Sequence, residues 1–588
     1  MEIMKKTLIS FMAALCCTVS LFAVPARRGT FTHTQPDGTQ LVLQRHGDEF
    51  LHWVTDASGQ VMEKDPDGYY RPTDAQTHAR RMAAAQLRRT DANRLRRRTA
   101  NKAGVASGQK HFLVILVEFS DLSFKNGNNK NAFSNMLNQE GYSANGATGS
   151  ARDYYYDNSH GDFEPIFDVY GPVKLENKKE YYGGNDSSGY DLRPEDAVKE
   201  GCEALDDEID FSQYDNDGDG EVDLVFMYYA GYGEADYDDD DAIWPHQWDF
   251  TSAGINLTLD GKKINNYACT NELVGYGSQS GKLAGIGTAC HEFGHAMGLP
   301  DLYDTDYKTN GEAGGLYAYS LMCDGGYNNE GRTPPYFNIE ERIMLGWLED
   351  SAIQEFPESG EYILAGVNDD VAYKTLTDQE GEYFVYECRN QTGWDAYIPE
   401  AGMVVYHVDK SDRKIYISGY GNVSAKELWE DWPSHNAINE RGSHPCFYLV
   451  PAGSQSNLNY SGSQWTFPGS ANATSFTAQS WNGVESVVKI TNISYSASKV
   501  TLMVEIPAAA LSYNIISNPG NGVYAAGTVF DLALVESTSQ PVSSVSWLFD
   551  DEPVSGSVTL PAGTHVVEAH VTLTSGVTKI LELTLQVE

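Results

Sequence analysis

Positive charge is scarce in this sequence, which holds 41 Lys and Arg residues against 82 Asp and Glu residues and has a formal net charge of -41. Because a polyanion repels another polyanion, nucleic acid is excluded as an expected partner. After Ala26 no apolar run is long enough to span a bilayer, so we expect no transmembrane segment. The acidic balance suits solubility outside a cell and also calcium binding.

Cysteine is scarce as well, with eight residues in the chain of 588. Two of them precede Ala26, and the other six are Cys202, Cys269, Cys290, Cys323, Cys388 and Cys446. In an exported chain they permit up to three disulfides, but the fifteen possible connectivities stay open. Cys290 and Cys323 are candidates for one disulfide, and buried free thiols are the equal alternative.

The stretch from Met1 to Ala26 has the order of a secretory signal peptide rather than of a spanning helix. Two lysines precede an apolar run from Leu8 to Ala23, and small residues follow as far as Ala26. A lipoprotein signal ending at Cys16 or Cys17 is the alternative, but the residues before these cysteines match such a signal poorly. We therefore expect a secreted, soluble mature protein.

The most informative stretch runs from Ala289 to Asp301 and reads A-C-H-E-F-G-H-A-M-G-L-P-D. Residues four apart share one face of a helix, so His291 and His295 can bind a single metal while Glu292 reaches a water on it. Zinc suits this geometry, and it lowers the pKa of its bound water to about 7. The pattern predicts a zinc peptidase site with Glu292 as the general base.

The third zinc ligand is predicted at Asp301. Gly298 can adopt a positive φ and end the helix, and Pro300 prevents the helix from resuming. The resulting turn brings Asp301 back towards the metal, at the position of the last histidine in the metzincin pattern H-E-x-x-H-x-x-G-x-x-H. A ligand from elsewhere, such as Glu312 in the gluzincin manner, is the alternative.

The stretch H-E-F-G-H-A-M-G-L-P-D-L-Y-D-T, together with the downstream Y-S-L-M, resembles the immune inhibitor A family of secreted bacterial metallopeptidases. The resemblance implies a zinc-dependent endopeptidase that acts on protein or peptide substrates. It also implies that Met322 forms an apolar floor beneath the zinc. Similar stretches are the D-Y-Y-x-x-x-S-x-G run that begins at Asp153 and the segment from Gln391 to Asp395.

The expected mechanism combines carbonyl polarisation by zinc, water activation by Glu292 and return of that proton to the leaving amine. Tyr327 and His246 are candidates for the oxyanion stabiliser, and neither is assigned. The competing hypothesis is a secreted adhesin or glycan-binding protein with an inactive peptidase domain. Intact His291, Glu292 and His295 argue against it. Contact with a surface or glycan through the C-terminal β domains is a further hypothesis.

A second cation site is predicted where carboxylates alternate with a glycine at the bend, as a calcium loop requires. Its proposed ligands are Asp215, Asp217, Asp219 and Asp223. The bidentate glutamate of an EF-hand loop is missing, because Phe226 stands at that position, so a polar turn is the alternative. The acidic run at 236–241 is interpreted as a solvated loop, and a further cation site is the alternative.

The fold class is predicted to be multidomain, with an α+β zincin (metzincin-like) catalytic domain between an N-terminal propeptide and C-terminal all-β domains. The expected division is a signal peptide at 1–26, a propeptide at 27–108, the catalytic domain at 109–350, an all-β domain at 351–507 and an immunoglobulin-like β-sandwich at 508–588. Strand-like runs at 111–119 and 163–173 support the catalytic domain.

The predicted propeptide ends in an arginine-rich run between residues 79 and 102, which we interpret as a cleavable linker of a zymogen. The segment from Arg27 to Gly108 contains no cysteine, so a thiolate is excluded as its inhibitory ligand. Occlusion of the cleft, or an oxygen or nitrogen group, must replace it. Asp65, Asp67 and His52 are the candidates, and the sequence does not rank them.

Overall fold

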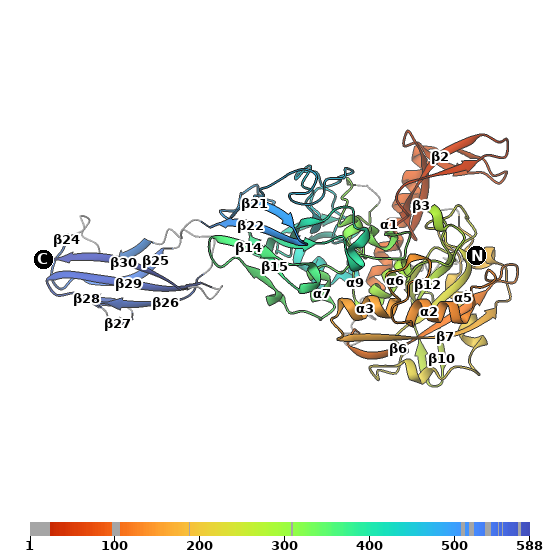
Figure 1. Ribbon diagram of the computed structural model, residues 1–588, viewed down its shortest axis with the longest axis horizontal. Helices are drawn as coiled ribbons and strands as arrows, with labels where there is room; N and C mark the ends of the chain where they lie inside the picture. Colours follow the sequence, from red (N-terminus) through yellow and green to blue (C-terminus); the bar gives the residue numbers. More distant parts are fainter. Residues whose placement is uncertain are drawn as a thin grey trace, which may run out of the picture. The chain divides into compact units, whose positions relative to one another are not determined.

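The computed structural model describes residues 24–96, 106–186, 189–306 and 310–506, and beyond these 512–516, 523–535, 542–550, 552–555, 557–573 and 578–588. Most of the predicted signal peptide and the end of the arginine-rich run lie outside the described residues. The chain forms two compact units, the first of 1–349, 391–399 and 414–445, the second of the remaining residues (Figure 1). Within the described part, no helix is both long and apolar enough to cross a membrane.

The first unit begins with an antiparallel sheet whose strands follow one another in sequence order. The strands are β1 (Thr30–Thr34), β2 (Gln40–Asp48), β3 (Leu51–Asp56), β4 (Val61–Lys64) and β5 (Tyr70–Pro72). Helix α1 (Ala75–Arg96) follows, as its alanine-rich sequence predicts. Phe50, Leu51 and Ala85 are buried in the same hydrophobic cluster as the strands of the central sheet, so this N-terminal region shares a core with the rest of the unit.

The central sheet has the order β7-β6-β8-β12-β9, and only β9 runs antiparallel to its neighbour. Its strands are β6 (Gly108–Glu118), β7 (Phe163–Lys174), β8 (Val225–Tyr232), β9 (His246–Asp249) and β12 (Asn266–Leu273). Strand β6 contains a continuous buried run from Phe112 to Val117, as expected for a central parallel strand covered on both faces. The short strands β10 (Leu257–Leu259) and β11 (Lys262–Ile264) form a separate hairpin.

Helices of the first unit surround this sheet and position the predicted site (Figure 1). They are α2 (Lys130–Asn138), α3 (Ala151–Asn158), α4 (Lys179–Gly183), α5 (Pro194–Ala204), α6 (Gly287–Met297) and α7 (Ile339–Met344). Capping boxes at Ser150 with Asp153 and at Asn338 with Glu341 start α3 and α7. The predicted site motif lies on α6, which contacts β12 and β9.

Part of the predicted all-β domain belongs to the first unit instead. This part consists of the segments 391–399 and 414–445. The second of them forms β18 (Lys414–Ile417), β19 (Gly421–Ser424), α8 (Ala425–Glu430) and α9 (Trp432–His435). Helix α1 packs against α9. The sequence division differs from the structure here because both segments make their tertiary contacts with residues of the first unit.

The second unit is all β, as its alternating short strands predict. One sheet contains β13 (Ile353–Glu355), β15 (Ala372–Leu376), β16 (Glu382–Arg389), β17 (Gly402–Asp409) and β20 (Phe447–Leu449), and another contains β14 (Gly360–Leu364), β22 (Lys499–Glu505) and β21 (Lys489–Ser496). One hydrophobic cluster, which includes Tyr386, Val405 and Leu502, joins the two sheets.

The C-terminal strands form a three-stranded and a five-stranded sheet. The strands are β23 (Ser512–Ile516), β25 (Val529–Val535) and β28 (Ser557–Thr559) in the first, and β24 (Val523–Tyr524), β30 (Thr578–Val587), β29 (Gly563–Leu573), β26 (Val542–Phe549) and β27 (Glu552–Val554) in the second. A small cluster that includes Leu560 and Leu585 lies in this region. A β-rich end of the chain is confirmed, and the immunoglobulin-like sandwich stays a prediction.

Candidate metal centre and peptidase site

Helix α6 holds the two motif histidines with their Nε2 atoms facing each other at 3.1 Å. The Nδ1 atoms of His291 and His295 lie 2.8 Å from the carbonyl oxygens of Leu321 and Leu299, respectively. A carbonyl only accepts, so each Nδ1 carries the proton and each Nε2 keeps its lone pair. Both rings are therefore arranged as metal ligands.

The turn after α6 brings Asp301 to the same point. Gly298 has φ 111°, a conformation that side chains with a Cβ rarely adopt, and it ends the helix as predicted. The Asp301 Oδ1 atom lies 3.3 Å from both Nε2 atoms. Although burial opposes its ionisation, His295 and His291 hold the pKa of Asp301 well below its ordinary value.

The set of His291, His295 and Asp301, called the triad below, fits a bound metal. One ligand atom from each residue lies within 4.8 Å of the others, and all three residues are buried. Asp301 Oδ1 is buried and has no hydrogen-bond donor. Two nitrogens and one oxygen are the donor set of a catalytic zinc, whose fourth position is taken by water. The structure does not place Glu312 in this group.

Asn436 orients Asp301, and sequence reasoning missed it. Its Nδ2 donates to Asp301 Oδ2 at 2.7 Å, and its Oδ1 accepts from the Asp301 backbone N–H at 2.8 Å. This paired contact leaves Oδ1 of Asp301 for the metal. Asn436 follows α9, 135 residues after Asp301, and carries no motif that could have revealed it.

Glu292 is fully buried beside the triad, and its partner comes from the start of the described chain. The backbone N–H of Val24 donates to Glu292 Oε1 at 3.0 Å. Trp244 Nε1 donates to the Val24 carbonyl at 3.1 Å, and the Tyr327 hydroxyl donates to the Pro25 carbonyl at 2.8 Å. Residues 24–28, called the leading segment below, therefore begin at the predicted general base.

Met322 packs directly beneath α6, where the sequence placed an apolar floor. It is fully buried, and a Cβ added at Gly294 would lie 2.8 Å from its sulfur. The Met322 carbonyl accepts from the Leu302 N–H at 2.8 Å and so ties this turn to the segment that carries Asp301. The close approach explains why glycine stands between the two histidines.

Residues 98–341 match the family described as immune inhibitor A peptidase M6, catalytic domain. The match contains the triad and Glu292, and it spans less than half of the chain. The resemblance predicted from the motif is thereby confirmed.

Two relatives illustrate the match to the immune inhibitor A family. Immune inhibitor A of Bacillus thuringiensis subsp. alesti is 28% identical over 269 residues, which span 39% of this chain and 38% of the relative. Pre-pro-metalloprotease PrtV of Vibrio cholerae serotype O1 (strain M66-2) is 27% identical over 269 residues, 39% of this chain and 29% of the relative. The alignments thus cover less than two fifths of either relative.

Among solved structures, wild-type OgpA from Akkermansia muciniphila aligns with 83% of this chain and 96% of its own. Its sequence identity is 10% and the TM-score is 0.23, so this likeness carries no argument.

The predicted calcium loop brings together Asp215, Asp217 and Asp223, which offer oxygens within 4.8 Å of one another. Asp219 is not in this group. It accepts instead from the N–H of Glu221 at 2.8 Å. Lys262 Nζ lies 2.6 Å from Asp215 Oδ2 and already supplies a positive charge to the cluster.

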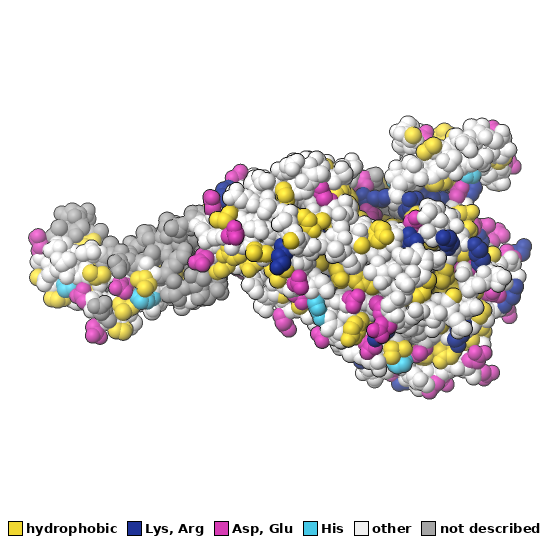
Figure 2. All heavy atoms as spheres, viewed as in Figure 1, with side chains coloured by type: hydrophobic (Ala, Val, Ile, Leu, Met, Phe, Trp, Pro, Cys, Tyr) yellow, Lys and Arg dark blue, Asp and Glu magenta, His cyan; other side chains and the backbone are white. Residues whose placement is uncertain are grey.

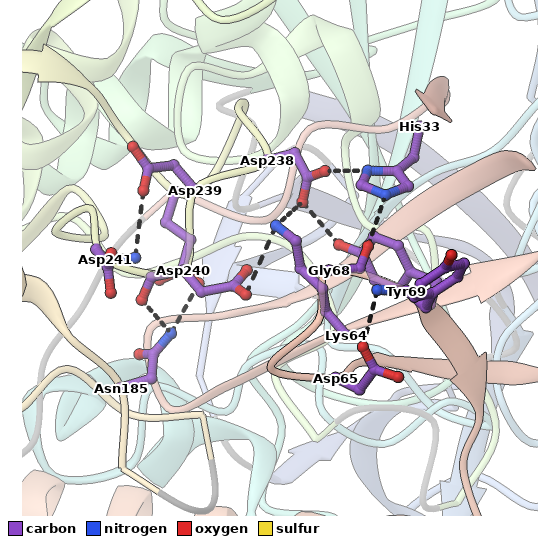
Figure 3. Close-up of polar contacts among 12 residues, drawn as sticks. His33, Lys64, Asp65, Gly68, Tyr69, Asn185, Asp238, Asp239, Asp240 and Asp241 are labelled. Carbon is purple, nitrogen blue, oxygen red and sulfur yellow. Dashed lines mark hydrogen bonds and ion pairs between the residues drawn. The ribbon is translucent and has the colours of Figure 1, made fainter. Parts of the chain in front are cut away.

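The acidic run at 236–241 is not simply solvated, which corrects the sequence interpretation. Figure 3 shows the carboxylates of Asp238 and Asp240 facing His33 and Lys64 of the N-terminal sheet, whereas Asp239 faces the backbone of Asp241. Asp238 Oδ2 lies 2.8 Å from His33 Nδ1, and Asp238 Oδ1 lies 3.3 Å from Lys64 Nζ. These pairs join segments that are far apart in the sequence, so the run alone could not reveal them.

The first part of the arginine-rich run is also less exposed than a cleavable linker would be. Arg89 is 1% exposed and pairs with Asp48, and Arg88 lies 3.6 Å from Asp186. Residues 97–102 lie outside the described residues. The linker interpretation is therefore wrong for Arg88 and Arg89, which helix α1 carries into the packed unit.

The remaining candidates have structural partners. His246 is fully buried, with Nδ1 2.7 Å from the Trp244 carbonyl and Nε2 3.0 Å from the Tyr267 hydroxyl. His52 lies 2.7 Å from Glu234, while Asp65 accepts from Arg71 at 2.6 Å. The six described cysteines are buried free thiols, and no disulfide joins them.

Proposed function

We propose that this protein is a secreted zinc-dependent endopeptidase made as a zymogen. The observation that carries the proposal is the convergence of His291, His295 and Asp301 with Glu292 beside them. The match to the immune inhibitor A family supports a metallopeptidase. The signal-like sequence up to Ala26 supports export.

The triad would hold zinc, which when bound supplies a Lewis acid for the substrate carbonyl and lowers the pKa of a water to about 7. Glu292 takes the proton of the attacking water and returns it to the leaving amine nitrogen. Burial of Glu292 excludes bulk water from this transfer. Asn436 and the carbonyls of Leu299 and Leu321 keep the three ligands in orientation.

Replacement of Glu292 by Gln tests the general base. The amide keeps the shape of the side chain but loses the basic oxygen, so peptide cleavage should fall by about 10²–10⁴. Metal content, measured on the same preparation, should stay at the wild-type level. Activity within tenfold of the wild type would contradict the role of Glu292, and activity that survives a zinc chelator would contradict the metal.

Latency is supported by the leading segment, which in the described chain brings the Val24 N–H to Glu292. If the signal peptide ends at Ala26 as predicted, the exported zymogen keeps only Arg27 and Arg28 of this segment. The N-terminal sheet reinforces the contact, since His33 and Lys64 pair with Asp238 and His52 pairs with Glu234. A substrate cannot reach Glu292 while the segment lies there. None of the three latch candidates from the sequence, Asp65, Asp67 and His52, belongs to the triad cluster.

The test of latency is a protease cut after the packed part of α1. In one variant, five basic residues are changed to glutamine: Arg94, Arg96, Arg97, Arg98 and Lys102. Trypsin should activate the unmodified chain and leave this variant inactive. A matched variant with Arg88 and Arg89 changed to lysine keeps both charges and should still be activated. Full activity of the uncut glutamine variant would refute the zymogen proposal.

We also propose that Asp215, Asp217 and Asp223 bind calcium, which would stabilise the fold. Asp215 Oδ1 is buried and has no hydrogen-bond donor, which leaves one carboxylate oxygen for a hard cation. The predicted ligand Asp219 is retained only as a neighbour of the loop.

A further inference from the structure

The leading segment runs away from Glu292 through a series of backbone contacts. After Val24 and Pro25, the Ala26 N–H donates to the Gly47 carbonyl at 2.8 Å and the Arg27 N–H donates to the Ala235 carbonyl at 3.1 Å. The segment therefore lies against the catalytic region as an extended peptide.

Arg28 ends the segment in an acidic and aromatic site. Its Nε lies 2.7 Å from Asp324 Oδ2, and its guanidinium carbon lies 5.1 Å from the centre of the Tyr317 ring. The Asp324 side chain is only 12% exposed, and its Oδ1 has no hydrogen-bond donor. A buried carboxylate with one oxygen left over requires a cation, and a guanidinium offers several N–H donors.

Arg27 lies over a second site of the same composition. Its guanidinium carbon lies 4.1 Å from the centre of the Tyr276 ring. Asp236, whose Oδ2 accepts from the Gly275 N–H at 3.1 Å, keeps a buried Oδ1 without a donor. Burial raises the pKa of Asp236 to about 6, and the positive charges of Arg45 and Arg27 oppose that rise.

We propose that Asp324 with Tyr317, and Asp236 with Tyr276, are two subsites that select basic side chains of peptide substrates. The inference rests on the proposed peptidase function and assigns its specificity. Each site combines a carboxylate with an aromatic face, which favours a planar guanidinium over an ammonium group. When the leading segment departs, Asp324 loses its ion pair with Arg28 and the Tyr276 ring loses its contact with Arg27, and substrate arginines replace both.

Val24 lies inside the predicted signal peptide, so it serves here only to mark where a peptide backbone meets Glu292, and in this way it sets the register of these subsites. Its N–H donates to Oε1 of Glu292, the carboxylate that under the proposed function returns a proton to the leaving amine. Val24 thus stands for the first residue beyond the scissile bond. Arg27 and Arg28 then stand for the fourth and fifth residues beyond it, on the amine side of the cut.

The test uses the full chain after trypsin activation and a fixed peptide that differs only at the fifth residue beyond the cut. With arginine there, kcat/KM should exceed that of the glutamine peptide by about ten- to a hundredfold, the range for hydrogen bonds to charged groups. Lysine should fall between the two. Asp324→Asn should remove most of the preference, whereas Asp207→Asn, which neutralises an exposed aspartate, should keep it.

A second peptide pair separates the two subsites. Arginine at the fourth residue should respond to Asp236→Asn and not to Asp324→Asn. Equal cleavage of the arginine and glutamine peptides by the wild type, or a preference for arginine only on the other side of the cut, would overturn the subsites. Failure to cleave any peptide would instead overturn the peptidase proposal. Because the wild-type comparison needs no variant, a variant that fails to fold leaves the test intact.

Discussion

Two clusters of metal-ligating side chains in the first unit differ in what their ligand atoms already contact. In the triad, Nδ1 of both histidines and Oδ2 of Asp301 have partners, while Nε2 and Oδ1 point at one another. In the loop of Asp215, Asp217 and Asp223, Lys262 already supplies an ammonium group at 2.6 Å.

The two clusters therefore differ in how much they need a bound cation, and the triad needs it more than the Asp215 loop. Lone pairs that converge at about 3 Å repel each other unless a proton or a metal ion lies between them, so the triad favours a bound metal. The Asp215 loop is partly neutralised by Lys262, and the Asn216 amide donates to Asp223 at 2.6 Å. We therefore expect strong binding at the triad and weak binding at the loop. Acidic side chains are spread over the face seen in Figure 2, so sign of charge alone does not locate either site.

The largest effect should follow from Asp301→Ala. Removal of one of three protein ligands should weaken metal affinity by more than the ~10–100-fold typical of an outer partner. Metal content after dialysis should fall from one equivalent to a small fraction. Asp217→Ala, which removes a carboxylate from the other cluster, should leave that content unchanged. Retention of zinc by the Asp301 variant would mean that another side chain supplies the third ligand.

Asn436→Ala should have the next largest effect, a loss of about 10–100-fold in metal affinity, because Asp301 loses the amide that orients it. Competition with a chelator measures the change. Asn439→Ala is the matched control, since Asn439 is buried in the same segment but donates to the Leu302 carbonyl at 2.9 Å. If both variants lose metal equally, Asn436 acts only through folding of the segment.

How much of the site the sequence could predict depends on how local each contact is. His291, Glu292 and His295 follow from the period of one helix, and Gly298 requires a turn that carries Asp301 back. All of these lie in one short stretch of the chain. Asn436 could not be predicted, because a single asparagine has no pattern and its contact depends on the folding of a distant segment.

The difference between local and long-range contacts also explains the wrong predictions about the charged runs. The acidic run at 236–241 was expected to be a solvated loop and the arginine-rich run a cleavable linker, because charged runs are usually exposed. Their partners, among them His33, Lys64 and Asp48, come from other elements. Strands β6 and β7 of the central sheet were predicted from the runs at 111–119 and 163–173, since a continuous apolar run such as Phe112 to Val117 indicates burial directly.

Calcium should have a smaller effect at the Asp215 loop. A tenfold excess over the dissociation constant raises the free energy of unfolding by about 1.4 kcal/mol if only the folded state binds. Thermal unfolding with calcium and with a chelator measures the shift. Asp217→Ala should abolish the response, and Asp219→Ala should keep it because the structure leaves Asp219 outside the cluster. If calcium does not change the thermal unfolding of the wild type, the loop is only a polar turn.

The smallest effect concerns acid and the ion pair of Asp215 with Lys262. Burial opposes ionisation, but the hydrogen bonds from Lys262 and Gly220 hold the pKa of Asp215 below its ordinary value of 3.8. In the unfolded chain the carboxyl binds a proton more readily, so its contribution to stability is present above pH 3.8 and is lost as the pH falls through the lower folded value. Urea unfolding without calcium at several pH values between about 5 and 3 measures this loss. Asp215→Asn should flatten the curve relative to Asp207→Asn, and an equal slope in both variants would show that Lys262 does not stabilise the folded carboxylate.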